Sequence, residues 1–161
     1  MLKKETRILG LSSPRRARFK PIIGAIFRGS LWLDAIVTYL PPRSKKGYVQ
    51  GLAAALQDTK QYSQIQAAIF SSEDVLEHKY QDYRRLSELI NFPVFAIIRK
   101  RSVKISTNEY VKIQRRKKKI MLWINGYSPQ RASALFSLGC TKDESIPEAV
   151  ILAELVARAL K

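Results

Sequence analysis

Hydrophobic and polar positions follow two different periods along the chain, and the earlier part has the period of strands. Residues 6–11, 21–27 and 31–39 are short apolar runs rich in β-branched and aromatic residues, and Gly, Pro or Ser bounds them. Gly29-Ser30 separates the second run from the third and predicts a tight hairpin turn. The chain is therefore predicted to begin with three strands, mostly antiparallel.

The period then changes to that of alternating helices and strands. Residues 64–70 predict a fourth strand, and the all-apolar residues 94–98 are typical of a parallel strand covered on both faces. A helix is expected before each of these strands, and the second one must end before Pro93. Their apolar stripes are Val49, Leu52, Ala53 and Leu56 in the first, and Tyr83, Leu86, Leu89 and Ile90 in the second.

The last third of the chain is predicted to add a strand and three helices. A capping box at residues 106–109 predicts a short helix at about 107–116, and residues 120–124 predict a strand. Ser128-Pro129 begins the next helix, and a second capping box at residues 145–148 begins a C-terminal one. The apolar stripe expected on that last helix is Leu152, Leu155, Val156, Ala159 and Leu160.

Three antiparallel strands followed by helix, strand, helix and strand, with flanking helices, suit an α/β fold with a ribonuclease H-like mixed sheet. In such a fold the ends of the first and fourth strands lie side by side. With 161 residues, 46% of them hydrophobic, we expect a single domain over residues 1–161 with a basic arm at about 99–119. No apolar run approaches the roughly 20 residues that cross a bilayer. The single Cys140 fits a reducing compartment, so we expect a cytoplasmic protein with no membrane partner.

The net charge of the chain and its distribution narrow the range of functions that the sequence supports. Lys and Arg number 29 against 13 Asp and Glu, which gives a formal net charge of +16. Twenty of these cations fall in residues 3–20, 43–46 and 99–119, and such clustering is typical of phosphate-backbone binding. A solvated surface on a thermostable protein, or a surface for anionic lipid, are the alternatives. The expected nucleic-acid contacts are Arg15, Arg16, Arg18, Lys20, Arg43, Lys45, Lys46, Arg115, Arg116, Lys117, Lys118 and Lys119. Base stacking is assigned to Trp32, Tyr48 and Trp123, if they are exposed.

Several segments resemble the archaeal endonuclease V-like family, a domain of unknown function sometimes labelled endonuclease dU. The similar segments are residues 4–11, 94–100, 126–129 and 146–155, with the Ile146-Pro147-Glu148 helix start the most specific. The resemblance covers the chain almost end to end. It implies a ribonuclease H-like fold and an ancestry in DNA or RNA cleavage beside a divalent metal ion.

The chain departs from that family at the metal ligands. Where the family ends its first strand with two aspartates, this chain has Ser12 and Ser13, and the family's aspartate-glycine after the fourth strand is Ser71-Ser72. Histidine is usual in the family at the position of Glu154. Mg²⁺ and Mn²⁺ need anionic oxygens, which serine does not supply. The sequence therefore predicts a degenerate metal site, and we expect no bound metal ion or cofactor.

Few acidic residues could replace the family's aspartates as metal ligands. Asp34 lies mid-strand and is expected to face solvent, Glu73 and Asp74 suit a loop or cap, and Glu154 suits an ion pair with Arg158, four residues on. Glu154 is therefore only a fallback catalytic acid. The lone His78 excludes a histidine-based site, and Cys140 is interpreted as a small buried residue.

Two functional hypotheses follow. The first is a non-catalytic, basic nucleic-acid-binding protein, with RNA favoured over DNA and a ribonucleoprotein such as the ribosome as a partner, and with no small-molecule substrate. The Ser12 and Ser71 hydroxyls are then hydrogen-bond donors to phosphate. The alternative is an active endonuclease of the endonuclease V type that uses Mg²⁺ or Mn²⁺ with a rearranged acid set, Glu154 with Asp34 or Glu73. A protein scaffold that uses an acidic face at residues 73–88 is compatible with the first.

Overall fold

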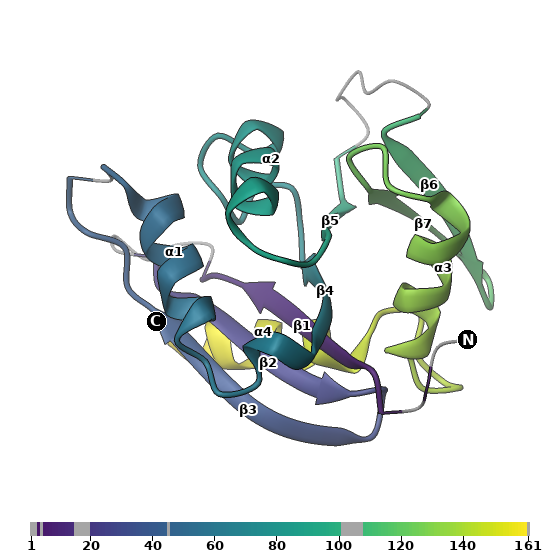
Figure 1. Ribbon diagram of the computed structural model, residues 1–161. Helices are drawn as coiled ribbons and strands as arrows, with labels where there is room; N and C mark the ends of the chain where they lie inside the picture. Colours follow the sequence, from purple (N-terminus) through teal and green to yellow (C-terminus); the bar gives the residue numbers. More distant parts are fainter. Residues whose placement is uncertain (1–2, 4, 15–19, 45, 101–107, 161) are drawn as a thin grey trace.

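Seven strands form one mixed sheet at the centre of the molecule. The structure, a computed structural model, describes residues 3, 5–14, 20–44, 46–100 and 108–160 (Figure 1). The sheet order is β3-β2-β1-β4-β5-β7-β6; β1 is parallel to β4 and β4 to β5, and the other neighbours are antiparallel. The strands are β1 (Arg7–Ser12), β2 (Ile22–Arg28), β3 (Trp32–Tyr39), β4 (Ile65–Phe70), β5 (Val94–Ile98), β6 (Tyr110–Arg115) and β7 (Lys118–Trp123).

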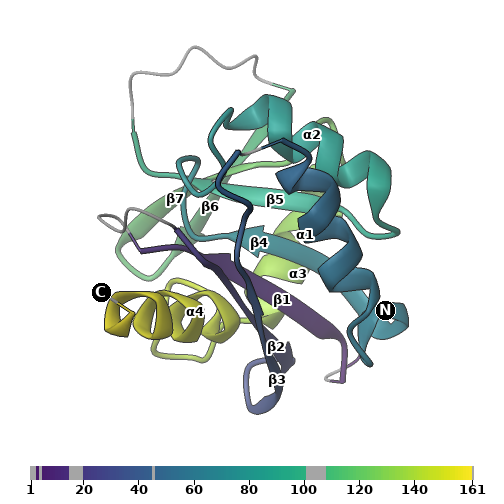
Figure 2. The same ribbon diagram turned by 90° about the vertical axis from the view of Figure 1, so that its left-hand side faces the viewer.

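Helices cover both faces of this sheet (Figures 1 and 2). Helices α1 (Tyr48–Gln57) and α2 (Tyr80–Leu89) pack on one face, where Trp123 is completely buried. Helices α3 (Pro129–Leu138) and α4 (Glu148–Ala159) pack on the other. A short 3₁₀ turn over Tyr62–Gln64 leads into β4.

Most of the predicted elements are confirmed. The first five strands and helix α3 lie within one or two residues of their expected bounds, α1 and α2 occur where their apolar stripes predicted them, and β7 begins two residues early. The Ser128 side chain accepts a hydrogen bond from the Arg131 backbone N–H at 3.3 Å, so it caps α3 as its position before Pro129 predicted. In the described part of the chain, no helix has the length and apolarity to cross a membrane.

The helix predicted at about 107–116 is wrong. Residues 110–115 form β6, which pairs antiparallel with β7 from Tyr110 opposite Trp123 to Arg115 opposite Lys118. The capping-box glutamate, Glu109, instead makes an ion pair with Arg84 on α2 at 2.8 Å. Cross-strand pairing therefore outweighs the local capping signal, and the rest of the expected helix start lies outside the described residues.

The apolar stripe predicted for α4 is also wrong. The buried residues are Ala149, Val150, Ala153 and Ala157, whereas Leu155 is 54% exposed. The cause is a close approach to β1, because a Cβ on Gly10 would lie 2.3 Å from the Ala149 backbone. Alanines therefore form most of the buried face of α4, while Leu155 is exposed and Leu152 of the predicted stripe is only partly buried against the core.

Candidate nucleic-acid interface

The ends of β1 and β4 lie side by side, as the parallel pairing predicted. Leu11 is opposite Phe70 in the ladder, and Ser12 and Ser71 follow these residues. The Ser71 hydroxyl donates a hydrogen bond to Ser12 Oγ at 2.8 Å, and each residue is only 4% exposed. The two hydroxyls therefore satisfy each other inside the protein, which corrects the expectation that they donate to a phosphate. Ser13 follows β1 and is half-buried.

Among the described residues, Arg99, the first residue after β5, is a cation bonded to this strand-end site. Its Nε donates to the Ser71 carbonyl oxygen at 2.9 Å, and its terminal nitrogen donates to Glu154 Oε1 at 2.9 Å. The Arg99 guanidinium therefore joins the end of β4 to α4. Glu154 also makes the predicted pair with Arg158, but at the longer distance of 3.6 Å. The sequence reasoning counted Arg99 among the basic residues without assigning it to the site; the available signal was its place directly after a strand parallel to β4.

Glu73 fixes the backbone from which Arg99 extends. Its two carboxylate oxygens accept hydrogen bonds from the backbone N–H groups of Arg99 at 2.9 Å and Lys100 at 2.7 Å. Glu73 is completely buried. A carboxylate that caps two backbone donors at the end of β5 has a structural role, which agrees with the loop or cap role predicted for it.

Asp74 and Asp34 are also held in ion pairs. Lys100 lies 2.8 Å from Asp74, and this hydrogen bond outweighs burial and lowers the pKa of the carboxyl. Asp34 does not face solvent as predicted: its side chain is 8% exposed and bonds to Arg7 at 2.6 Å and Arg28 at 2.9 Å. Arg7 begins β1 and Ser12 ends it, so Asp34 lies at the far end of that strand, roughly 15 Å from the serines.

These residues do not fit a divalent metal ion. Within the described residues, no three His, Cys, Asp or Glu side chains are close enough to hold one. At the strand ends, the guanidinium of Arg99 is bonded to the Ser71 carbonyl oxygen, and the Glu154 carboxylate is already bound to that guanidinium. A cation placed here would meet neutral hydroxyls and a competing positive charge, which is the reverse of what Mg²⁺ needs.

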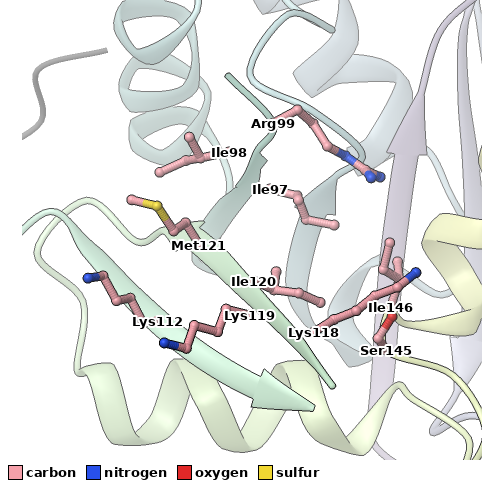
Figure 3. Close-up of a pocket in the computed structure, with 10 residues that line it drawn as sticks. All are labelled: Ile97, Ile98, Arg99, Lys112, Lys118, Lys119, Ile120, Met121, Ser145 and Ile146. Carbon is pink, nitrogen blue, oxygen red and sulfur yellow. The ribbon is translucent and has the colours of Figure 1, made fainter. Parts of the chain in front are cut away.

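A cleft of about 480 Å³ lies beside this site and shares Arg99 with it (Figure 3). It forms because the β5–β7 ladder stops at Ile98 opposite Met121, whereas β7 continues back to Lys118 with β6 as its only partner. The segment that leads into α4 supplies another part of the lining, through Ser145 and Ile146.

The lining of the cleft is apolar at its centre and cationic around it. Ile97 and Ile120 lie in the middle of the view in Figure 3, while Lys112 and Lys119 lie on one side. Arg99 and Lys118 extend toward the opposite side, where Ser145 and Ile146 are. No acidic side chain is among the ten described residues that line the cleft. Its lining therefore repels cations and attracts phosphate groups.

The β6–β7 hairpin divides the predicted basic cluster into two sets. Arg115 donates to the carbonyl oxygens of Glu144 and Thr141, both at 3.2 Å, and Arg116 pairs with Asp143 at 2.7 Å. These two arginines anchor the hairpin to the loop before α4. Lys118 and Lys119 line the cleft, joined by Lys112 from β6, which was not among the expected contacts. Lys117 is exposed in the hairpin turn.

The remaining predicted contacts are dispersed. Lys20 is exposed just before β2, and Arg43 and Lys46 are exposed in the loop between β3 and α1. The predicted contacts that lie outside the described residues are Arg15, Arg16, Arg18 and Lys45.

Two of the three aromatic candidates for base stacking are buried. Trp123 is completely buried in the core, and Tyr48 donates a hydrogen bond to buried Asp82. Trp32 is 68% exposed, but it begins β3, at the end of the sheet away from Ser12. The prediction that Trp123 and Tyr48 stack on bases is therefore wrong.

The acidic face proposed at residues 73–88 is also weaker than predicted. Glu73 and Asp82 are buried and hydrogen-bonded, and Asp74 is neutralised by lysines.

Cys140 is buried as expected, and burial raises the pKa of its thiol to about 12.

Comparisons with known proteins bear on the fold. No protein-family model and no curated protein sequence matches the chain. Among solved structures, a protein of unknown function from Archaeoglobus fulgidus has a TM-score of 0.76 at 17% identity, over 96% of this chain and 97% of that one. Endonuclease V from Ciona intestinalis, in complex with a DNA that contains inosine, has a TM-score of 0.65 at 11% identity, over 96% and 85%. Argonaute from Marinitoga piezophila, in complex with a guide RNA, has a TM-score of 0.61 at 12% identity, over 96% of this chain and 30% of that one.

At these identities the likeness is one of fold. It extends over nearly the whole of this chain in each comparison, and the sheet order, parallel centre and flanking helices agree with the order of elements expected from the sequence. The protein therefore has a ribonuclease H-like α/β fold of the kind found in endonuclease V.

Proposed function

We propose that the protein is a non-catalytic nucleic-acid-binding protein, built on a nuclease fold in which an arginine has replaced the metal ion as the cation of the site. The observation that carries this proposal is the position of Arg99, bonded to the Ser71 carbonyl and to Glu154 at the ends of β4 and α4. A guanidinium supplies positive charge for phosphate without the water activation that hydrolysis requires.

The cleft supports the same function. Lys112, Lys118 and Lys119 add three charges beside Arg99. A formal net charge of +16 supplies a long-range field that draws a polyanion toward the protein. The nucleic acids in the Ciona and Marinitoga structures belong to those proteins, and they make DNA and RNA reasonable ligands to test here.

RNA is the favoured ligand. The lining offers lysines and apolar side chains but no Asn, Gln, Asp or Glu among its described residues, and these are the side chains that read adenine or cytosine edges. Recognition by backbone and shape is common for structured RNA, so we place the protein in a ribonucleoprotein such as the ribosome.

The experiment measures binding and cleavage together. Labelled structured RNA, and DNA with and without inosine, are titrated with protein in EDTA, then incubated with Mg²⁺ or Mn²⁺ and analysed for cleavage. We expect metal-independent binding, tighter for RNA, and no cleavage. Arg99→Gln should weaken binding about tenfold, because one charge-assisted phosphate contact is lost. Arg131→Gln, on α3, removes one charge elsewhere and should have little effect.

The alternative is the active endonuclease with a rearranged acid set. It requires Glu154 to act with Asp34 or Glu73, but Asp34 is bonded at the far end of β1 and both Glu73 oxygens bind backbone. Metal-dependent cleavage that Glu154→Gln abolishes would establish the alternative and overturn the non-catalytic proposal.

A further inference from the structure

Strand β3 forms one edge of the sheet and has an unusual surface. It pairs with β2 on its inner side, and no other strand of the described chain pairs with its outer side (Figures 1 and 2). Of the eight large hydrophobic side chains that are exposed among the described residues, five lie within residues 31–40. They are Leu31, Trp32, Leu33, Ile36 and Leu40.

The register of β3 explains why part of this surface is uncovered. Ile36 is opposite Ala25 and Leu33 is opposite Phe27, and Ala25 and Phe27 belong to the core under α3 and α4. An irregularity at Asp34 puts Leu33 and Ile36 on this same face. Helix α4 packs over β1 and β2 and leaves β3 beyond its edge. The two side chains are each 47% exposed as a result.

The edge has only part of the usual protection against pairing. Natural sheets blunt a long edge strand with Lys, Pro, a β-bulge or an inward charge, and β3 has only the irregularity at Asp34 and the inward charge of Asp34 itself. Residues 31–40 contain no Lys, Arg or Pro, and their one charged residue, Asp34, is neutralised by Arg7 and Arg28 of the same sheet. An eight-residue strand with free backbone groups is therefore exposed next to apolar side chains.

The same stretch is an electrostatically neutral window on a strongly basic protein. Cations flank it at Arg28 and Arg43, and none occurs between Leu31 and Pro42. Two copies with a net charge of +16 each repel one another, and a stretch without lysine or arginine adds no positive charge to that repulsion.

We propose that β3 is the interface of a homodimer, in which β3 of two copies pairs antiparallel about a two-fold axis near Ile36 and joins the two sheets. A two-fold axis perpendicular to the sheet makes the pairing antiparallel, and a strand edge is complementary to itself in that arrangement. The axis places Ile36 opposite Ile36 of the second copy, and brings Leu40 of each strand near the Leu31 end of the other.

The apolar area is sufficient for a dimer. The exposed fractions of the five side chains, from 47% to 75%, correspond to about 500 Å² for each copy. Two copies together carry about 1,000 Å² of such surface before the backbone is counted, which reaches the lower limit of a specific interface when all of it is covered. The five side chains lie within residues 31–40, and about 500 Å² of exposed apolar surface is in the size range of patches that are often functional.

The dimer does not depend on the proposed function, so it is measured without nucleic acid. Nuclease-treated protein at about 1 M salt, which removes bridging by residual RNA, is analysed by sedimentation equilibrium at roughly 50 µM, above micromolar dissociation constants. We expect twice the chain mass of 18.4 kDa for the wild type and for Leu89→Lys, a matched change on α2. Ile36→Lys should be monomeric with an unchanged circular dichroism spectrum. A monomeric wild type, or a dimeric Ile36→Lys, would overturn the proposal.

A cross-linking variant tests the geometry even if Ile36→Lys fails to fold. Opposite residues of an antiparallel pair lie about 4.5–5.5 Å apart at Cα, within the range of a disulfide. Ile36→Cys should therefore form a covalent dimer under mild oxidation, whereas Leu89→Cys should not. The native Cys140 is buried and does not compete. Equal cross-linking of both variants would refute pairing through β3.

Discussion

The number of charges in the cleft sets the salt dependence of nucleic-acid binding. Lys112, Lys118 and Lys119 line the cleft, and each lysine that neutralises a phosphate releases a condensed counterion. Each such contact contributes about 0.9 to the slope of log K against log salt for duplex and about 0.7 for single strands. Replacing all three by Gln should therefore reduce the slope by roughly 2 to 3 units.

The assay is fluorescence anisotropy with one labelled RNA between about 50 and 200 mM KCl. Over this fourfold range of salt, a slope difference of about 2.7 means that the wild type loses roughly 40-fold more affinity than the triple variant. The control replaces Lys60, Arg131 and Lys142 by Gln; these exposed cations lie outside the cleft lining, and the net charge falls by the same three units. Equal slopes for the two variants would refute a localised cleft, since only total charge would then matter.

Three further predictions concern stability and the lost metal site. Glu73→Ala removes the buried carboxylate that accepts from the part-buried backbone N–H groups of Arg99 and Lys100, and should lower the free energy of unfolding by about 3–5 kcal/mol, measured by urea denaturation; an effect below about 1 kcal/mol would contradict its role. Burial opposes ionisation of Asp34, but its hydrogen bonds from arginines lower the pKa of the carboxyl below 3.8. The contribution of Asp34 to folding stability is therefore complete above that pH and is lost as the pH falls through the lowered value. Asp34→Asn should thus cost about 1–2 kcal/mol at pH 7 and progressively less below about pH 4, and a cost independent of pH would contradict this. Ser12→Asp with Ser71→Asp should gain a Mn²⁺-dependent rise in melting temperature only when Arg99→Ala is added, since Arg99 otherwise neutralises the new carboxylates; an equal rise without Arg99→Ala would show that the guanidinium does not exclude the ion.

The sheet was predictable because its strands carry strong local signals. The Gly29-Ser30 turn fixed the first hairpin, and the unbroken apolar run at β5 indicated a strand covered on both faces. Parallel pairing of β1 with β4 then brings Ser12 beside Ser71 without any knowledge of side chains. This part of the site follows from topology, which the order of elements determines.

The failed predictions depend on what lies opposite each segment in the fold. The stripe of α4 was wrong because Gly10, 139 residues before Ala149, allows an approach that only small side chains tolerate. The helix at 107–116 was wrong because β7 supplies backbone partners for residues 110–115. Local periodicity cannot report either effect, since each depends on what packs opposite.

The strand-end site shows the same limit in its chemistry. The sequence places serines at the ends of the first and fourth strands, and their identity can be read directly. The sequence did not reveal which residues bond to one another at this site. Arg99, Ser71 and Glu154 come from three separate segments, and their bonds span 28 and 55 residues. The Ser12 and Ser71 hydroxyls alone would provide no charge for a ligand, because they are neutral and bonded to each other. With Arg99 held between β4 and α4, and with the lysines of β6 and β7 across the cleft, the same position has a positive charge with a fixed location. Fixed positive charge beside a cleft is the property that phosphate binding needs.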